Sequence, residues 1–239
     1  MDSKRIALVT GANKGIGLEI ARQLARADIE VIIGARDEER SQATAKRLAD
    51  EGLSVRSVCL DLNDQASIAA AAKEITDLGG RLDILVNNAG IFDFSDATPS
   101  KASIDAVRRV MEVNFIGTLA VTQAMLPLLR AAPSARIVNL SSSLGSLTLN
   151  GDPASIYYSQ QYIGYNASKA ALNMLTIQLN AELRETEIVV NSVSPGFVKT
   201  DLTGYGSMTP EEGARLPVQY ALGGGRSGRF VEPDGETPW

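Results

Sequence analysis

A chain of 239 residues, 44% of them hydrophobic and 21% charged, has the composition of a globular protein and the length for one large α/β domain or two small ones. Its net charge of −5 at pH 7 argues against a nucleic-acid-binding surface, which requires clustered Lys and Arg. Because the chain has no histidine, Ser-His-Asp hydrolysis, His-ligated metal sites and imidazole acid–base catalysis are excluded, and we expect no metal site.

The sequence also predicts a cytoplasmic protein. The N-terminus passes directly into a strand pattern without a secretory leader, and no apolar run approaches the roughly 20 residues that a membrane span requires. Cys59 is the only cysteine, so an intrachain disulfide is excluded and nothing indicates an oxidising compartment. We therefore expect neither a membrane nor a nucleic acid among the partners.

The first predicted strand, residues 5–10, is followed by a glycine-rich turn at 11–17 and an amphipathic helix at 18–27. Glycine lets the backbone turn tightly and approach a pyrophosphate, and a helix N-terminus offers free N–H groups and a positive dipole end. The spacing G-x-x-x-G-x-G differs from the usual G-x-G-x-x-G, and a turn that needs glycine only for steric reasons is the alternative. In this context we expect dinucleotide binding by the turn residues Gly11, Asn13, Lys14, Gly15, Ile16 and Gly17.

The second predicted strand, residues 30–34, indicates which cofactor is bound. An acidic side chain at its end would accept the ribose hydroxyls of NAD, but the chain has Ala35 and Arg36 there. The planar guanidinium of Arg36 suits a 2′-phosphate, and Lys14 is a second cation within reach. The alternative is a solvated arginine ahead of the next helix. We expect NADP(H).

The alternation of helices and strands continues to residue 193. Helices are expected at 37–51, 65–77 and 103–129, and strands at 54–60, 82–86, 135–140 and 188–193. Repeated βα units predict an α/β fold: a single Rossmann-type, doubly wound parallel sheet with helices on both faces, in one domain over residues 1–239. Ligands of such sheets lie beyond the C-terminal ends of the strands, where the segments 11–17, 61–64, 87–90, 141–143 and 195–196 fall.

A candidate acid–base pair comes before the last of these strands. Residues 167–185 have the composition of a long helix and contain no Pro or Gly. If the helix begins by Tyr165, Lys169 lies one turn later on the same face, and its charge would lower the phenol pKa from its usual value near 10. The alternative is that Tyr165 anchors a helix end and Lys169 is solvated. Of the six tyrosines, only Tyr165 has a lysine at this spacing.

Taken in chain order, the glycine turn, Asn87-Asn88-Ala89-Gly90, Asn114, the serines at 141–143, Tyr165-x-x-x-Lys169 and Pro195-Gly196 resemble the short-chain dehydrogenase/reductase family. The resemblance extends from about residue 4 to at least residue 203 and is closest to NADPH-preferring carbonyl reductases. It implies that Tyr165 exchanges a proton with the substrate oxygen, while Lys169 lowers the phenol pKa and holds the nicotinamide ribose. It also implies that Ser142 hydrogen-bonds the substrate oxygen.

The resemblance implies further roles. Asn114 would bind a water connecting Lys169 to solvent, although a packed polar residue in mid-helix is the alternative. The cofactor would be bound by Tyr165 and Lys169 together with residues at the strand ends, namely Asp61, Leu62, Asn88, Ala89, Gly90, Pro195, Gly196, Val198 and Thr200. Of these, Asp61 and Leu62 would contact the adenine, and Thr200 the carboxamide.

Two segments depart from the family pattern. Residues 143–164 are longer than the usual link and resemble, in miniature, the insertion of monomeric carbonyl reductases; their tyrosines either wall the pocket or only pack. This leaves monomer or homo-oligomer open. The glycine-rich segment 223–228 is the second departure. An apolar pocket is suggested by Phe92, Phe94, Leu144, Phe197 and Met208, although core packing explains each almost as well.

Two functions are therefore open. The first is reversible, NADPH-dependent reduction of a small-molecule ketone or aldehyde to an alcohol. The second is a catalytically silent NADP(H)-binding sensor or docking module. The combination of Ser142, Tyr165 and Lys169 favours the enzyme, because a silent module has no use for all three.

Overall fold

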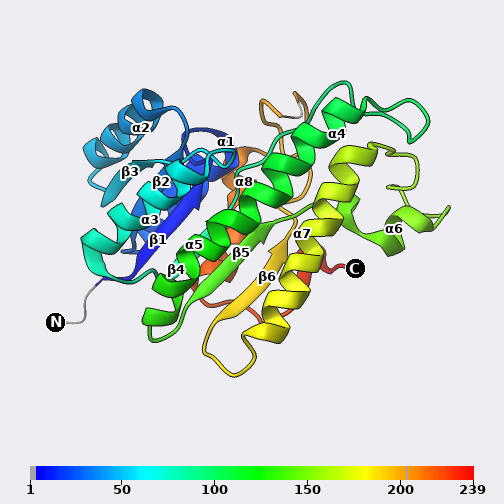
Figure 1. The fold of residues 1–239 in the computed structure, drawn as a ribbon. Coiled ribbons are helices and arrows are strands. Elements are labelled where there is room, and N and C mark those ends of the chain that lie inside the picture. Colours follow the sequence, from blue (N-terminus) through cyan, green and yellow to red (C-terminus); the bar gives the residue numbers. More distant parts are fainter. Residues whose placement is uncertain (1–3, 203) are drawn as a thin grey trace.

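The computed structural model describes residues 4–202 and 204–239, and in this part of the chain eight strands form one sheet (Figure 1). The strands are β1 Ile6–Thr10, β2 Glu30–Ala35, β3 Val55–Cys59, β4 Ile84–Asn87, β5 Arg136–Leu140, β6 Val189–Val193, β7 Arg229–Glu232 and β8 Gly235–Glu236. Their order is β3-β2-β1-β4-β5-β6-β7-β8, with β1 to β7 parallel and β8 antiparallel to β7. The winding reverses between β1 and β4. The predicted doubly wound fold is confirmed.

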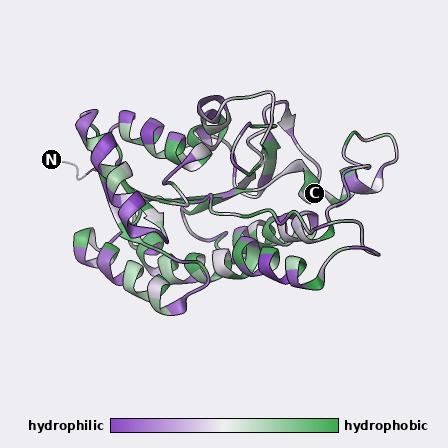
Figure 2. Cartoon of the chain, turned by 90° about the horizontal axis from the view of Figure 1, so that it is seen from above, coloured by the Kyte–Doolittle hydropathy of each residue, from purple (hydrophilic) through white to green (hydrophobic). Residues whose placement is uncertain are grey.

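Helices cover both faces of the sheet (Figures 1 and 2). Alternate side chains of β1 point to opposite faces: Ala7 and Val9 pack with α1, α2 and α8, and Leu8 packs with α3, α5 and α7. The helices are α1 Gly15–Arg26, α2 Glu38–Asp50, α3 Gln65–Gly79, α4 Ile104–Met111, the π-helical η1 Glu112–Gly117, α5 Thr118–Ala131, the short 3₁₀ helix η2 Ser143–Gly145, α6 Leu147–Gly151, α7 Ile163–Glu182 and α8 Pro210–Leu222.

The expected elements are present, with most ends moved by one or two residues. Two helices begin earlier than predicted, α1 at Gly15 and α7 at Ile163. The tract expected at 103–129 contains the π-helical segment η1 in its middle. The sequence interpretation did not include α6, α8 or the β7–β8 hairpin.

One helical tract of the described residues, 104–131, is long and apolar enough by composition to cross a membrane. In this fold it is the continuous run of α4, η1 and α5. The side chains of Val121, Met125 and Leu129 on this tract are fully buried in the core beneath the sheet. The tract is therefore accounted for as a core helix, whose apolar side chains pack on the sheet.

Candidate active site

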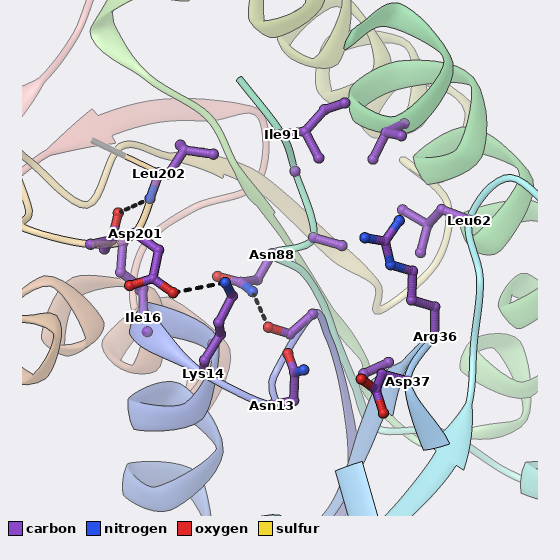
Figure 3. A pocket seen from close by; sticks show the side chains of 18 of the residues that line it. Asn13, Lys14, Ile16, Arg36, Asp37, Leu62, Asn88, Ile91, Asp201 and Leu202 are labelled. Atoms are coloured by element: carbon purple, nitrogen blue, oxygen red, sulfur yellow. Dashed lines mark hydrogen bonds and ion pairs between the residues drawn. The ribbon is translucent and has the colours of Figure 1, made fainter. Parts of the chain in front are cut away.

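A cleft of about 490 Å³ lies where the winding of the sheet reverses, beyond the C-terminal ends of β1, β2 and β4. The structure brings thirteen of the predicted cofactor residues to its lining: Gly11, Asn13, Lys14, Gly15, Ile16, Gly17, Arg36, Asp61, Leu62, Asn88, Ala89, Gly90 and Thr200. These residues come from segments up to 189 positions apart in the sequence (Figure 3). The strand-end rule therefore located the cleft correctly.

The glycine turn is packed directly on the segment that follows β4. Gly11 has φ +65°, and a Cβ there would lie 2.9 Å from the Ala89 Cα; a Cβ on Gly17 would lie 2.7 Å from the Gly11 carbonyl oxygen. The Asn88 side-chain amide donates to the Thr10 carbonyl oxygen at 2.8 Å and to the Gly11 carbonyl oxygen at 3.3 Å. The steric interpretation of these glycines is supported, because a side chain there would clash with the neighbouring backbone, and dinucleotide binding by the turn stays a prediction.

The first turn of α1 faces the cleft as an anion site. Lys14 is the N-cap residue, no described side chain caps the turn, and the turn contains no acidic residue. The unsatisfied N–H groups and the positive end of the helix dipole therefore favour a phosphate. This geometry fits the pyrophosphate of a dinucleotide.

The part of the cleft beside the end of β2 carries two arginines, Arg36 and Arg40, and two aspartates, Asp37 and Asp61. The exposed Arg36 side chain lines it, close to Leu62 (Figure 3). Arg40 also lines the cleft, and the sequence analysis missed it. The sequence contains the indication, because Arg40 stands about one helical turn after Arg36, at the start of α2. The nearby Asp37 carboxylate caps α2 and pairs with Arg40 Nε at 3.0 Å, so its charge is compensated.

Lys14 differs from expectation. Its ammonium nitrogen lies 2.8 Å from Asp201 Oδ2, across the cleft from Arg36, where we had expected both cations at one phosphate (Figure 3). The Asp201 carboxylate is thus the ion-pair partner of Lys14 in the protein. Both side chains are largely exposed, so this ion pair contributes little to stability.

Tyr165 and Lys169 both lie on α7, which satisfies the condition set by the sequence. The Lys169 Nζ atom is 5.7 Å from the Tyr165 ring centroid and donates a hydrogen bond of 2.7 Å to the Leu140 carbonyl oxygen at the end of β5. Lys169 is only 5% exposed. The alternative of a solvated lysine is therefore wrong.

The expected effect of Lys169 on the phenol is not found in the protein alone. Burial raises the pKa of Tyr165 to about 12, and the side-chain hydrogen bond with Ser142 acts in the opposite direction. Burial also lowers the pKa of Lys169 to about 8. Desolvation disfavours the charged form of both groups and outweighs their attraction. At neutral pH the phenol thus carries its proton, and Ser142 is its hydrogen-bonding partner.

Asn114 lies in the π-helical segment η1 and holds the chain that follows β4. Its Oδ1 accepts from the Ile91 N–H at 2.8 Å, while its Nδ2 donates to the Ile91 carbonyl oxygen at 2.9 Å and to Ser168 Oγ at 3.0 Å. These contacts match the alternative of a packed polar residue. They also bring η1, the loop after β4 and α7 together beside Gly90.

Five predicted cofactor residues do not line the cleft, namely Tyr165, Lys169, Pro195, Gly196 and Val198. Gly196, after Pro195, has φ +84°, and a Cβ there would lie 2.8 Å from the Met208 sulfur. Val198 is 3% exposed, bridges to Met208 and packs beside Gly213. The Val198 side chain is therefore part of the packing around Met208 and Gly213.

A cluster of aromatic side chains around Phe92 includes Tyr165. The Phe92 ring lines the cleft, and its centroid lies 5.6 Å from that of Tyr165, 5.1 Å from Tyr162 and 5.5 Å from Phe94, each in an edge-to-face arrangement. Tyr162 is thus the tyrosine of segment 143–164 that packs on a cleft-lining ring, but no residue of this segment lines the cleft itself. Phe197 pairs with Tyr205 at 5.4 Å, and both are more than half exposed.

Comparisons with known proteins agree with this geometry. The model of the short chain dehydrogenase family matches residues 5–209. The short-chain dehydrogenase anuI of Penicillium roqueforti is 37% identical over 229 residues, covering 93% of this chain and 90% of that protein. Carbonyl reductase (NADPH) 1 of Mus musculus is 34% identical, covering 99% of both. The solved structure of NADPH-bound carbonyl reductase from chicken fatty liver matches with a TM-score of 0.86 at 33% identity, covering 99% of each chain.

Proposed function

The chain belongs to the short-chain dehydrogenase family and is an NADP(H)-dependent oxidoreductase, and on this premise we propose that it reduces a small-molecule ketone or aldehyde to the alcohol, reversibly. The single observation that carries the proposal is the placement of the Tyr165 phenol, which is hydrogen-bonded to the Ser142 side chain and lies beside Phe92, a residue that lines the cleft. A positioned tyrosine is one of the side chains that act as general acids.

The residues of the cleft fit the cofactor. The close-packed glycines leave room for the pyrophosphate at the N-terminus of α1, and Arg36 and Arg40 provide charge for a 2′-phosphate. Asp61 and Leu62 line the adenine end, and Thr200 lines the opposite wall. NADPH, when bound, supplies the hydride that reduces the carbonyl carbon.

The protein residues handle the proton. We assign Tyr165 as the donor to the substrate oxygen and Ser142 as its partner in holding that oxygen. Lys169 lies behind the phenol on the same helix, and its charge would stabilise the phenolate left after transfer. Asn114 supports this group by fixing the loop after β4 against α7. In the alcohol-oxidising direction the same phenol would accept the proton.

The test is NADPH oxidation by the purified protein with a panel of aryl ketones, aldehydes, quinones and keto esters. Tyr165→Phe should lower kcat by about 10²–10⁴-fold, the usual contribution of general acid catalysis, and leave NADPH affinity nearly intact. Tyr158→Phe removes a phenol from the neighbouring exposed segment and serves as the matched control. If Tyr165→Phe turns over as fast as wild type, the assignment of the proton donor is wrong.

The same assay tests the alternative, a silent NADP(H)-binding module, because such a module would bind NADPH and turn over none of the panel.

Three smaller predictions accompany the proposed function. These are one domain over residues 1–239, a location in the cytoplasm, and a monomer or a homo-oligomer as the active form. The sheet with its two helical layers supports the first of these.

A further inference from the structure

Asp96 is a buried carboxylate that the proposed reaction does not use. It is 6% exposed and lies in the loop between β4 and α4. Its Oδ1 atom accepts from the backbone N–H of Ala97 at 2.9 Å and of Gly164 at 3.0 Å, and its Oδ2 atom accepts from the backbone N–H of Tyr165 at 2.8 Å. A buried carboxylate is costly unless it is hydrogen-bonded, and here both oxygens are.

We propose that Asp96 is a positioning residue that sets where Tyr165 lies, by capping the first turn of α7 from another part of the chain. This inference rests on the proposed role of Tyr165. Two of the three N–H groups that Asp96 accepts belong to consecutive residues of that turn, and one of them is the N–H of the tyrosine itself.

The first turn of α7 has no cap of its own. Tyr162 occupies the N-cap position and makes no side-chain cap hydrogen bond. Unsatisfied N–H groups in a buried helix terminus require acceptors, and a carboxylate is also favoured there by the helix dipole. Asp96 meets both needs over a separation of nearly 70 residues.

Gly164 allows this contact. A Cβ at position 164 would lie 3.1 Å from Asp96 Oδ2 and 3.1 Å from the Val107 Cα, so a side chain there would press on the carboxylate and on α4. Close packing at this point leaves the helix start little freedom relative to the loop. A displacement of the carboxylate would therefore move the backbone of Tyr165.

The loop that carries Asp96 is itself anchored. Asp93 accepts two hydrogen bonds from the Arg109 guanidinium, at 2.9 and 2.8 Å, and the Ile91 backbone is held by Asn114. Between these anchors, the Phe92 ring meets the Tyr165 ring edge to face. The loop therefore holds Tyr165 through its ring and through its backbone, and Asp96 provides the second contact.

The test compares Asp96→Ala and Asp96→Asn with wild type for kcat, for NADPH affinity and for unfolding free energy. Misplacing a catalytic group by 1 Å can cost about 10²-fold in rate, so we expect Asp96→Ala to lower kcat by at least tenfold. NADPH affinity should stay unchanged, because the glycine turn and Arg36 do not touch Asp96. Asp96→Asn retains one acceptor oxygen and should restore part of the rate.

Gly164→Ala perturbs the same contact from the helix side and should give the same loss of kcat without loss of NADPH affinity, which keeps the test available if Asp96→Ala fails to fold. Asp105→Asn is the matched control: it removes an exposed carboxylate of α4 that pairs with Arg108 and lies outside the loop that holds Tyr165. Its kcat should stay near that of wild type.

Wild-type kcat in Asp96→Asn and Gly164→Ala would overturn the inference, as would equal losses in Asp105→Asn, or parallel losses of rate and NADPH affinity. Failure of the proposed function looks different. In that case wild type itself is inactive across the carbonyl panel, or Tyr165→Phe retains full rate.

Discussion

At the scale of single residues, charge pairing separates the three cations of the cleft. Lys14 is paired with Asp201 and Arg40 with Asp37, whereas Arg36 forms no ion pair within residues 4–202 and 204–239. An unpaired arginine gives up no protein partner when it binds a phosphate. Arg36 is therefore the cation expected to discriminate most strongly between NADPH and NADH.

Arg36→Leu should lower kcat/KM for NADPH and leave the value for NADH nearly unchanged. A hydrogen bond to a charged group contributes about 1.5–3 kcal/mol, which corresponds to a loss of roughly tenfold to a hundredfold. Arg40→Leu should cost less, because Arg40 already pairs with Asp37. The ratio of kcat/KM for the two cofactors is the measurement.

Arg47→Leu, the same change in the last turn of α2 and outside the cleft, is the control. Combining Ala35→Asp with Arg36→Leu should reverse the preference, since aspartate accepts the ribose hydroxyls and repels the phosphate. A wild-type enzyme that prefers NADH would contradict this account of Arg36. If only Lys14→Met changes the ratio of kcat/KM for the two cofactors, the 2′-phosphate is bound by Lys14 and not by Arg36.

At the scale of elements, the order of strands and helices followed from local sequence, because each strand of a doubly wound sheet is a short apolar run that ends in polar or glycine residues. The start of α7 did not follow. The helix extends back to residue 163 where Asp96, far away in the sequence, accepts the N–H groups of Gly164 and Tyr165, and the Ala97 carbonyl oxygen accepts that of Ile163. A cap of this kind has no local pattern, so the sequence placed the start four residues late.

Other misses have different physical causes. The helix α8 carries a recognisable start, in which Thr209 and Glu212 form a capping box and Pro210 stands in the first turn, and the sequence analysis did not use it. The interior Pro217 weakens a periodic helical pattern there. The π-helical segment around Asn114 has the composition of an ordinary helix, so no local sequence pattern marks its i→i+5 backbone bonding.

The glycine turn gives a prediction at this scale. A Cβ at Gly17 would lie 2.4 Å from Asn88 Nδ2 and 2.7 Å from the Gly11 carbonyl oxygen, so Gly17→Ala must push the turn off the loop after β4. Overpacking of this kind costs about 1–3 kcal/mol. NADPH affinity and Tm should both fall. Gly151→Ala, where an added Cβ meets nothing within 4 Å, is the control and should change neither. Full NADPH affinity in Gly17→Ala would show that the turn tolerates the shift.

At the scale of the whole molecule, the fold buries an ammonium group without a carboxylate beside it. Lys169 lies under the C-terminal end of β5, where its hydrogen-bonding partner is the Leu140 carbonyl oxygen. The pKa of Lys169 is lowered to about 8 from 10.5, so the folded protein disfavours the charged form of a group that the proposed reaction needs. The buried Lys169 ammonium thus lowers the unfolding free energy, and interactions elsewhere in the fold compensate for this loss.

The stability cost of burying Lys169 changes with pH, so its direction can be measured as a change in unfolding free energy. Below about pH 8 both states carry the Lys169 proton and the penalty is fully present. Between pH 8 and 10.5 the unfolded chain keeps the proton and the folded protein loses it, so this group makes the unfolding free energy rise with pH. The rise approaches about 3 kcal/mol when complete. Above pH 10 the raised pKa of Tyr165 acts in the opposite direction, because the folded protein then holds a proton that the unfolded chain has lost.

Lys169→Met removes the buried ammonium and keeps a long apolar side chain. Urea unfolding of the cofactor-free protein at pH 7 to 10 should show that the variant's stability, relative to wild type, decreases steadily as the pH rises, since only wild type is relieved of its penalty. Lys46→Met, at an exposed position on α2, controls for the loss of a lysine. If the difference between Lys169→Met and wild type does not change from pH 7 to 10, Lys169 keeps its proton in the folded state. Its pKa is then not lowered, and the stability cost assigned to its burial is absent.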